Sequence, residues 1–279
     1  MHISRKDFLR ALGLAGTGLL LNTTARSATG GSWPGAGQSF TLGLASYTFR
    51  NFSLEDTIKA ASRLGLKKLA LKSMHLPLDS TPAQIREAVA RIREAGLELY
   101  GAGVIYMKTE AEVNQAFDYA KNAGMEVIIG VPNHELLHLA DKKVKEYNIK
   151  LAIHNHGPGD QLYSSVKDVY ERIKDLDKRI GLCMDIGHVV RIQEDPAALA
   201  IKYKDRLYDC HLKDEDKREA DGKPIEAGRG VIDLPAFLKA VTETGYAGTL
   251  SFEYEKDGDD PLPGLAESVG YVKGILTML

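Results

Sequence analysis

The sequence is poor in cysteine and tryptophan, with 2 Cys and 1 Trp among 279 residues. So few thiols exclude a small scaffold held together by disulfides. Neither charge sign dominates, because 36 Lys and Arg stand against 38 Asp and Glu. A nucleic acid partner, which needs clustered basic residues, is therefore not expected. Apolar residues make up 44% of the chain and charged residues 27%, which is typical of a globular domain and excludes collagen-like or largely disordered chains.

One apolar run lies near the N-terminus, Ala11–Leu21, directly after a basic segment. It is too short to span a bilayer and predicts an export signal over residues 1–28. Ser4–Arg10 resembles the twin-arginine export box, with Lys6 in place of the second arginine. A twin-arginine-like or a Sec signal is therefore expected. An uncleaved membrane anchor is the alternative.

Export predicts a periplasmic protein that has no stable membrane association once the signal is cleaved. Residues 29–38 contain mostly glycine and other small residues, which predicts a flexible linker. The folded domain is then expected over residues 39–279.

From Thr41 onward, short apolar runs alternate with segments of helical periodicity, as in repeated βαβ units. Eight such pairs predict a single α/β domain, a (β/α)₈ TIM barrel, whose typical length is roughly 250 residues. A doubly wound sheet is the competing fold, but the turn after Phe49 lacks the glycines typical of it. The predicted strands are Thr41–Phe49, Lys67–Met74, Glu98–Tyr106, Glu126–Val131, Lys150–His154, Ile180–Ile186, Leu207–Lys213 and Thr249–Glu253.

Boundary residues support the helices between these strands. Ser53 and Thr81 are suitable N-caps, and Pro82 occupies the favoured first position of its helix. Gly96 and Gly124 follow the ends of two helices, where a left-handed residue is often needed. The predicted helices are Ser53–Leu64, Thr81–Ala95, Glu110–Ala123, His134–Tyr147, Ser165–Leu176, Pro196–Tyr203, Leu234–Thr244 and Gly264–Thr277.

Potential metal ligands lie at the ends of the last four predicted strands: His154, Asp185, His211 and Glu253. In a TIM barrel the carboxyl ends of the strands meet at one face, so these side chains are expected to converge. Two imidazoles and two carboxylates favour one divalent ion, Mn²⁺, Zn²⁺, Co²⁺, Fe²⁺ or Mg²⁺, over Ca²⁺. Buried polar groups that pair with one another for stability are the alternative.

Several motifs at these strand ends resemble the xylose isomerase-like barrels of the sugar isomerase and epimerase superfamily. The resemblance lies in Met184–His188, His211–Asp214, Phe252–Glu253 and the run Gly228–Asp233. It implies a TIM barrel in which Glu, Asp, His and Glu hold a divalent metal. Asp185, His211 and Glu253 match three of those ligands, whereas His154 stands where many epimerases have a glutamate.

The resemblance implies an enzyme that removes a proton next to a sugar carbonyl, as an isomerase or epimerase does. Because His154 breaks the symmetric pair of glutamates, isomerisation with one base or elimination is favoured over epimerisation with two. Ser46–Arg50 and Lys72–Leu78 also resemble exported members that act as lyases or hydratases on 3-keto-glycosides. The expected partner is a small carbohydrate, and a homo-oligomer is possible.

Roles follow from the chemistry of proton abstraction. Glu253 is predicted to be both a metal ligand and the general base. His188 is predicted to transfer protons or, together with His156, to bind substrate hydroxyl groups. Lys213 is predicted to neutralise developing negative charge. Further substrate contacts are predicted, with packing as the alternative for each, at Tyr47, Lys72, His75, Tyr106 and, for an anionic group, Arg229.

Other motifs predict no chemistry. His134–His138 matches the HExxH zinc-protease pattern, but both histidines fall away from the apolar stripe of their helix. By strand alternation Cys183 and Cys210 face opposite sides of the sheet, so no disulfide is expected. Two other functions remain: a barrel that binds sugar without turnover, and an endonuclease for abasic DNA, which the missing basic face and extra metal ligands disfavour.

Overall fold

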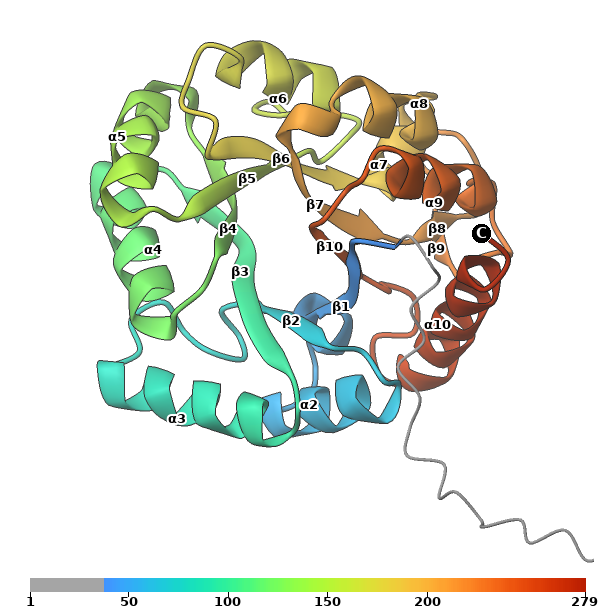
Figure 1. Cartoon of the computed structure of the whole chain (residues 1–279), viewed down its shortest axis with the longest axis horizontal. Coiled ribbons are helices and arrows are strands. Elements are labelled where there is room, and N and C mark those ends of the chain that lie inside the picture. Colours follow the sequence, from blue (N-terminus) through green and yellow to red (C-terminus); the bar gives the residue numbers. More distant parts are fainter. Residues whose placement is uncertain (1–37) are drawn as a thin grey trace, which may run out of the picture. The chain divides into compact units, whose positions relative to one another are not determined.

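A computed structural model describes residues 38–279 of the chain. Eight parallel strands form a closed barrel in the order β1-β10-β7-β6-β5-β4-β3-β2, as the sequence predicts (Figure 1). The barrel strands are β1 (Thr41–Ala45), β2 (Lys68–Leu71), β3 (Glu98–Met107), β4 (Val127–Pro132), β5 (Lys150–His154), β6 (Ile180–Asp185), β7 (Leu207–Leu212) and β10 (Thr249–Phe252). The export signal predicted over 1–28 and the linker predicted over 29–38, except its last residue, lie outside the described residues.

Helices surround the strands on the outside of the barrel (Figure 1). They are α2 (Leu54–Arg63), α3 (Pro82–Glu94), α4 (Glu110–Ala123), α5 (Leu137–Tyr147), α6 (Val166–Ile173), α7 (Ile186–Arg191), α8 (Pro196–Lys202), α9 (Leu234–Glu243) and α10 (Leu262–Leu276). The predicted caps are confirmed for two of them. Ser53 Oγ accepts a hydrogen bond from the Asp56 backbone, and Thr81 forms a capping box with Gln84.

Two local features differ from the sequence prediction. The first predicted strand ends early, because Ser46–Phe49 form a 3-10 helix after β1. The second ends at Leu71, and there Ser46 Oγ accepts a hydrogen bond of 2.7 Å from the Lys72 backbone. This bond ties the ends of β1 and β2 together, so tertiary contacts outweigh the strand propensity of the following residues.

Two short elements were not predicted, and both lie beside the carboxyl ends of the barrel strands. Helix α7 starts directly after β6, because the carboxylate of Asp185 caps it at the His188 backbone N–H. The second element is an antiparallel ribbon of β8 (Asp214–Glu215) and β9 (Pro224–Ile225). These elements place polar side chains around the last strands of the barrel.

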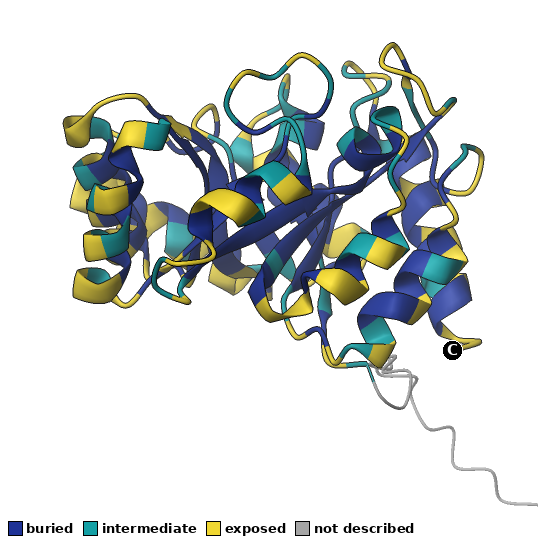
Figure 2. Ribbon diagram, turned by 90° about the horizontal axis from the view of Figure 1, so that it is seen from above, coloured by how far each residue is buried: buried dark blue, intermediate teal, exposed yellow. Residues whose placement is uncertain are grey.

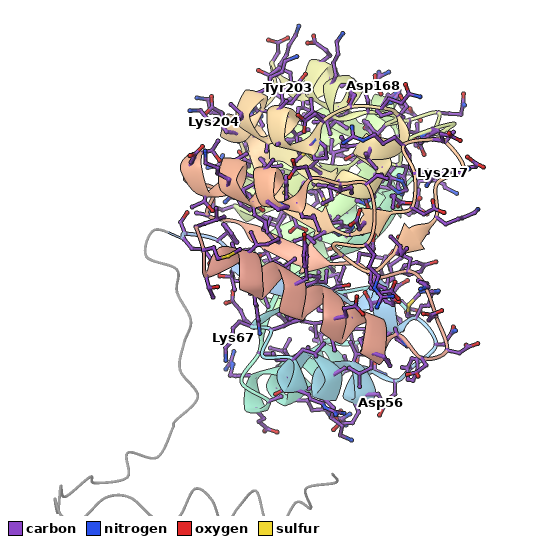
Figure 3. All side chains as sticks on the ribbon, turned by 90° about the vertical axis from the view of Figure 1, so that its right-hand side faces the viewer. Asp56, Lys67, Asp168, Tyr203, Lys204 and Lys217 are labelled. Atoms are coloured by element: carbon purple, nitrogen blue, oxygen red, sulfur yellow. The ribbon has the colours of Figure 1, made fainter. Side chains whose placement is uncertain are left out.

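The strands are buried on both sides, and the helices expose only their outer faces (Figure 2). Such double burial is expected of a parallel sheet covered by helices. Charged side chains such as Asp56, Asp168 and Lys204 lie at the periphery of the domain (Figure 3). Across residues 38–279, no helix is long and apolar enough to cross a membrane.

Candidate metal centre

Four predicted ligands meet at the carboxyl ends of the last barrel strands. Nε2 of His154 lies 3.1 Å from Nδ1 of His211, and that nitrogen lies 3.0 Å from Oε2 of Glu253. Oδ2 of Asp185 lies 3.5 Å from Nε2 of His154. All four residues are buried, and one ligand atom from each lies within 4.8 Å of the others. The convergence predicted from the strand ends is thus found in the structure.

Strand register places Asp185 and His211 side by side, whereas His154 is level with the residue two positions before Asp185 on β6. His154 is paired with Cys183 across β5 and β6, and Asp185 with His211 across β6 and β7. Asn155 then fixes the end of β6, because its side chain accepts a hydrogen bond from the Asp185 backbone N–H at 3.0 Å. The carboxyl ends of β5 and β6 are therefore held together where His154 and Asp185 lie.

The donor set fits a divalent ion. The buried oxygen Oδ2 of Asp185 faces the other ligands and pairs with the ammonium group of Lys213 at 2.8 Å. In the three contacts given above, which join His154 to His211, His211 to Glu253 and His154 to Asp185, the ligand atoms are 3.0–3.5 Å apart. Ligands held about 2.0–2.2 Å from one ion are spaced in roughly this way. A divalent ion in this position would contact Oδ2 of Asp185, Oε2 of Glu253 and the two facing imidazole nitrogens, and it would share both carboxylates with Lys213.

The local charges keep the carboxylates ionised and one imidazole neutral. Burial opposes ionisation of Asp185, but the charges of His188 and Lys213 outweigh it and hold the pKa of Asp185 well below its usual range. Burial lowers the pKa of His154 well below its usual range. Burial also acts to lower the pKa of His211, but Glu253 outweighs this effect and raises it. His154 therefore presents the neutral imidazole that a metal ligand needs.

Lys213 lies among the acidic members of this group. Its ammonium nitrogen is 2.8 Å from Oδ2 of Asp185 and 2.9 Å from Oε2 of Glu253, and it also pairs with Glu255. Gly187 leaves room for this arrangement, since a β-carbon there would lie 2.6 Å from Cδ of Lys213. The side chain of Lys213 is only 3% exposed, so it is no surface lysine.

A wall of aromatic and imidazole rings lies next to the four ligands. The ring centres of His154 and His156 are 4.5 Å apart, and the ring centre of His188 lies 5.9 Å from each of them. The ring of Tyr106 stacks on His156, and its hydroxyl lies 3.0 Å from Nε2 of His156. Tyr106 is 45% exposed, so its ring and hydroxyl are accessible to a ligand.

The wall continues to the first two strands of the barrel. The ammonium group of Lys72 lies 5.6 Å from the ring centre of Tyr47 and 6.0 Å from that of Tyr106. It also donates a hydrogen bond of 2.9 Å to the Val104 carbonyl. Burial lowers the pKa of Lys72, while Glu253 raises it less strongly. Three predicted substrate contacts, Tyr47, Lys72 and Tyr106, are thus neighbours.

Comparison with known families agrees with this geometry. Residues 58–275 match the model of the xylose isomerase-like TIM barrel. The chain belongs to this family.

Relatives of the xylose isomerase-like chain include metabolic enzymes. An inosose dehydratase of Lacticaseibacillus casei is 27% identical over 195 residues, which cover 54% of this chain and 65% of that enzyme. The match thus spans slightly less than two thirds of the relative's length. The IOLI protein, solved with a zinc atom, has a TM-score of 0.71 at 15% identity, with 86% of this chain and 99% of that chain covered.

A third similar protein is the 3-keto-D-glucoside 4-epimerase YcjR of E. coli. Its TM-score is 0.68 at 14% identity, with 84% of this chain and 99% of that chain covered. At such low identity the two solved structures establish the shared barrel alone. The zinc atom and the epimerase reaction are properties of those proteins.

Two predicted substrate residues lie apart from this group. Arg229 is exposed and forms a bidentate ion pair with Glu267 of α10. His75 is buried, and its ring nitrogens lie 2.9 Å from Ser46 Oγ and 3.1 Å from the Phe49 carbonyl. The structure gives both side chains structural partners, and it brings neither of them to the four ligands.

Asp214, to which the sequence assigns no role, organises a loop beside the last barrel strands. The carboxylate of Asp214 accepts hydrogen bonds from the backbone N–H groups of Gly228, Gly230 and Ile232. The run Gly228–Asp233 of this xylose isomerase-like barrel is thus folded around Asp214. Its place in the motif His211–Asp214, directly after Lys213, is the sequence feature that could have indicated this role.

The HExxH segment is not a metal site in this structure. His134 begins a 3-10 helix, and its Nε2 lies 2.8 Å from the Leu162 carbonyl, whereas His138 is exposed on α5. Cys183 and Cys210 are both buried and free in the described chain, as predicted. Cys183 lies close to His154 and His211, a contact that the sequence reasoning did not anticipate.

Proposed function

We propose that this protein is a divalent-metal-dependent lyase that removes water from a keto-sugar or keto-cyclitol. The observation that carries the proposal is the convergence of His154, Asp185, His211 and Glu253, in which one imidazole replaces a carboxylate. Such a site offers one carboxylate base on one side of the substrate. The similarity to an inosose dehydratase supports elimination over two-base epimerisation.

A bound divalent ion would polarise the substrate carbonyl and stabilise the enolate that forms when the neighbouring proton is removed. His154, Asp185, His211 and Glu253 are the residues that would hold it. The native ion is proposed to be Mn²⁺, Zn²⁺, Co²⁺, Fe²⁺ or Mg²⁺, since the ligand set suits each of them.

Glu253 is proposed to take the proton next to the carbonyl. Burial opposes its ionisation, but His211 and Lys213 hold the pKa of Glu253 well below its usual range, so the carboxylate is available as an acceptor. Its Oε2 lies against both of those groups, while Oε1 forms none of the hydrogen bonds found among residues 38–279. The ammonium of Lys213 offsets negative charge beside the reacting carbon.

The departing hydroxyl group needs a proton donor on the substrate side. Tyr106 and His156 share a hydrogen bond at 3.0 Å, and Tyr106 is the accessible partner. We assign to this pair the donation of a proton to the departing hydroxyl group. Afterwards the pair takes up a proton from solvent, and Glu253 releases to solvent the proton that it removed from the substrate. The sum is loss of one water from the substrate. His188 and Lys72 are proposed to bind substrate hydroxyl groups.

Isomerisation is the second candidate, because it shares the first step. It would return the proton to the neighbouring carbon in place of expelling hydroxide. A carbohydrate-binding barrel without turnover would perform neither step.

The test is a screen of keto-inositols, 3-keto-glucosides, aldoses and ketoses in D₂O, with each metal supplied separately. We expect deuterium exchange next to the carbonyl and a product lighter by one water. Glu253→Gln should abolish exchange, and Glu243→Gln, on the exposed side of α9, should not. Exchange without water loss would favour the isomerase, and no exchange with any compound would contradict enzymatic function.

A further inference from the structure

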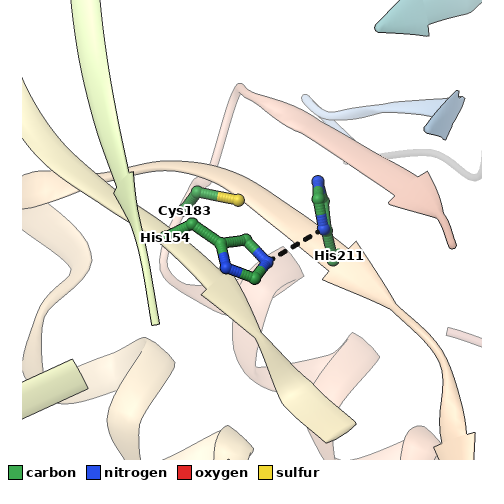
Figure 4. A group of neighbouring side chains, drawn as sticks. All are labelled: His154, Cys183 and His211. Atoms are coloured by element: carbon green, nitrogen blue, oxygen red, sulfur yellow. Dashed lines mark hydrogen bonds between the residues drawn. The ribbon is translucent and has the colours of Figure 1, made fainter. Parts of the chain in front are cut away.

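A second potential ligand set lies against the first and includes a thiol. His154, Cys183 and His211 are all buried, and one ligand atom from each lies within 4.8 Å of the others (Figure 4). Cys183 lies two residues before Asp185 on β6, so its side chain points to the same side of that strand. The two imidazoles therefore belong to two ligand sets. Asp185 and Glu253 complete the oxygen-containing set, and Cys183 completes the sulfur-containing set.

The two imidazoles face each other within the buried site. One nitrogen of each ring takes part in the 3.1 Å contact between the rings. The other nitrogens, Nδ1 of His154 and Nε2 of His211, are buried without a hydrogen-bond partner among residues 38–279. The two residues are 2% and 1% exposed. Because the two nitrogens of an imidazole point away from each other, one ion shared by both rings would be bound through the nitrogens that face each other, Nε2 of His154 and Nδ1 of His211.

The thiol also has a neighbour that can accept its proton. The S–H group of Cys183 donates to Oδ2 of Asp209 over 3.8 Å, and the same oxygen lies 4.0 Å from Nε2 of His211. Metal binding requires the thiolate. When a metal–sulfur bond forms, the S–H proton would pass to the carboxylate of Asp209 and from there to solvent.

We propose that Cys183, with His154 and His211, forms an inner site for a thiophilic ion such as Zn²⁺ or Cd²⁺. Thiolate and imidazole ligands suit these ions, whereas Mg²⁺ and Mn²⁺ prefer the oxygen-containing set. Because both histidines are shared, an ion in the inner site withdraws them from Asp185 and Glu253. Thiophilic ions are therefore inhibitors of an enzyme that works with Mn²⁺, a consequence that rests on the proposed function.

The test is titration of the full protein with Cd²⁺, monitored through the ultraviolet charge-transfer absorption of a cadmium–thiolate bond. The wild type should develop this band at one equivalent. Cys183→Ser should lose it and bind Cd²⁺ at least tenfold more weakly. Cys210→Ser is the matched control, because Cys210 is equally buried but lies outside the ligand set, and it should keep the band.

Cadmium-113 NMR of the wild type provides a second measurement that does not depend on the folding of a variant. A shift typical of sulfur coordination supports the inner site, and a shift typical of nitrogen and oxygen ligands alone overturns it. A band that persists in Cys183→Ser would also overturn it. Binding of Mn²⁺ to the wild type, followed by electron paramagnetic resonance, tests the oxygen-containing set separately, so the two proposals can fail independently.

Discussion

The ammonium nitrogen of Lys213 lies 2.8 Å from Oδ2 of Asp185, the oxygen that faces the other candidate metal ligands. A buried cation therefore already offsets the charge that a metal ion would offset. Removing one partner of such a buried group leaves uncompensated charge and typically costs about 3–5 kcal/mol. The free energy of unfolding should thus depend more strongly on Lys213 in the metal-free protein than in the metal-bound protein.

Lys213→Met should destabilise the metal-free protein by about 3–5 kcal/mol, because three carboxylates lose their shared cation. Saturating Mn²⁺ should then raise the melting temperature of this variant more than that of the wild type. Differential scanning calorimetry with and without Mn²⁺ measures both effects. Lys217→Met, at a half-buried lysine that pairs with Asp221 at the periphery of the domain (Figure 3), is the control. Equal metal-induced shifts in Lys213→Met and the wild type would contradict this account.

His211→Ala should reduce bound metal from about one ion per chain to almost none, since the nitrogen lost lies next to two other ligands. Elemental analysis after dialysis against Mn²⁺ or Zn²⁺ gives the stoichiometry. His138→Ala removes the exposed histidine of the HExxH segment and should leave the metal content unchanged. Loss of metal in His138→Ala but not in His211→Ala would place the metal site on α5 and refute the assigned centre.

Tyr106→Phe keeps the ring that stacks on His156 but removes the hydroxyl proposed to protonate the leaving group. Loss of a general acid typically lowers the rate by about 10²–10⁴-fold, so water loss should slow by at least about 10². Deuterium exchange next to the carbonyl should continue, because Glu253 is retained. Tyr271→Phe, at an exposed position on α10, should affect neither rate. Parallel loss of both activities would assign Tyr106 to substrate binding instead.

His75 predicts a pH dependence of stability that is separate from the metal ligands. Burial lowers the pKa of His75 in the folded protein. The unfolded chain, with a pKa of about 6.5, therefore binds more protons below that pH, and the free energy of unfolding falls as the pH decreases. One such group contributes a slope of at most about 1.4 kcal/mol per pH unit.

His75→Asn removes this titration and should flatten the decline of stability in the metal-free protein below pH of about 6.5. Urea unfolding at a series of pH values measures the slope. The exposed His138 provides the control, because His138→Asn should leave the slope unchanged. A slope that is equal in His75→Asn and the wild type would show that His75 does not contribute.

Much of the site could be predicted because its information is local. Alternation along a strand places His211 and Lys213 on one side of the sheet, and the ends of parallel strands share one edge. Those two facts bring His154, Asp185, His211 and Glu253 to one face of a barrel without knowledge of the helices. Hydrophobic periodicity and caps such as Ser53 similarly determine the order of strands and helices.

Contacts between distant segments were decided only by the tertiary structure. The pattern Gly228–Asp233 left Arg229 free to bind an anion, but Asp214 folds the loop so that Arg229 reaches Glu267. For His75 the sequence leaves substrate contact and packing open, and the structure shows packing, because Ser46 and the turn after β1 hold the ring. Sequence periodicity determines the face on which a side chain lies, whereas its partner depends on the packing of loops that are far apart in the chain.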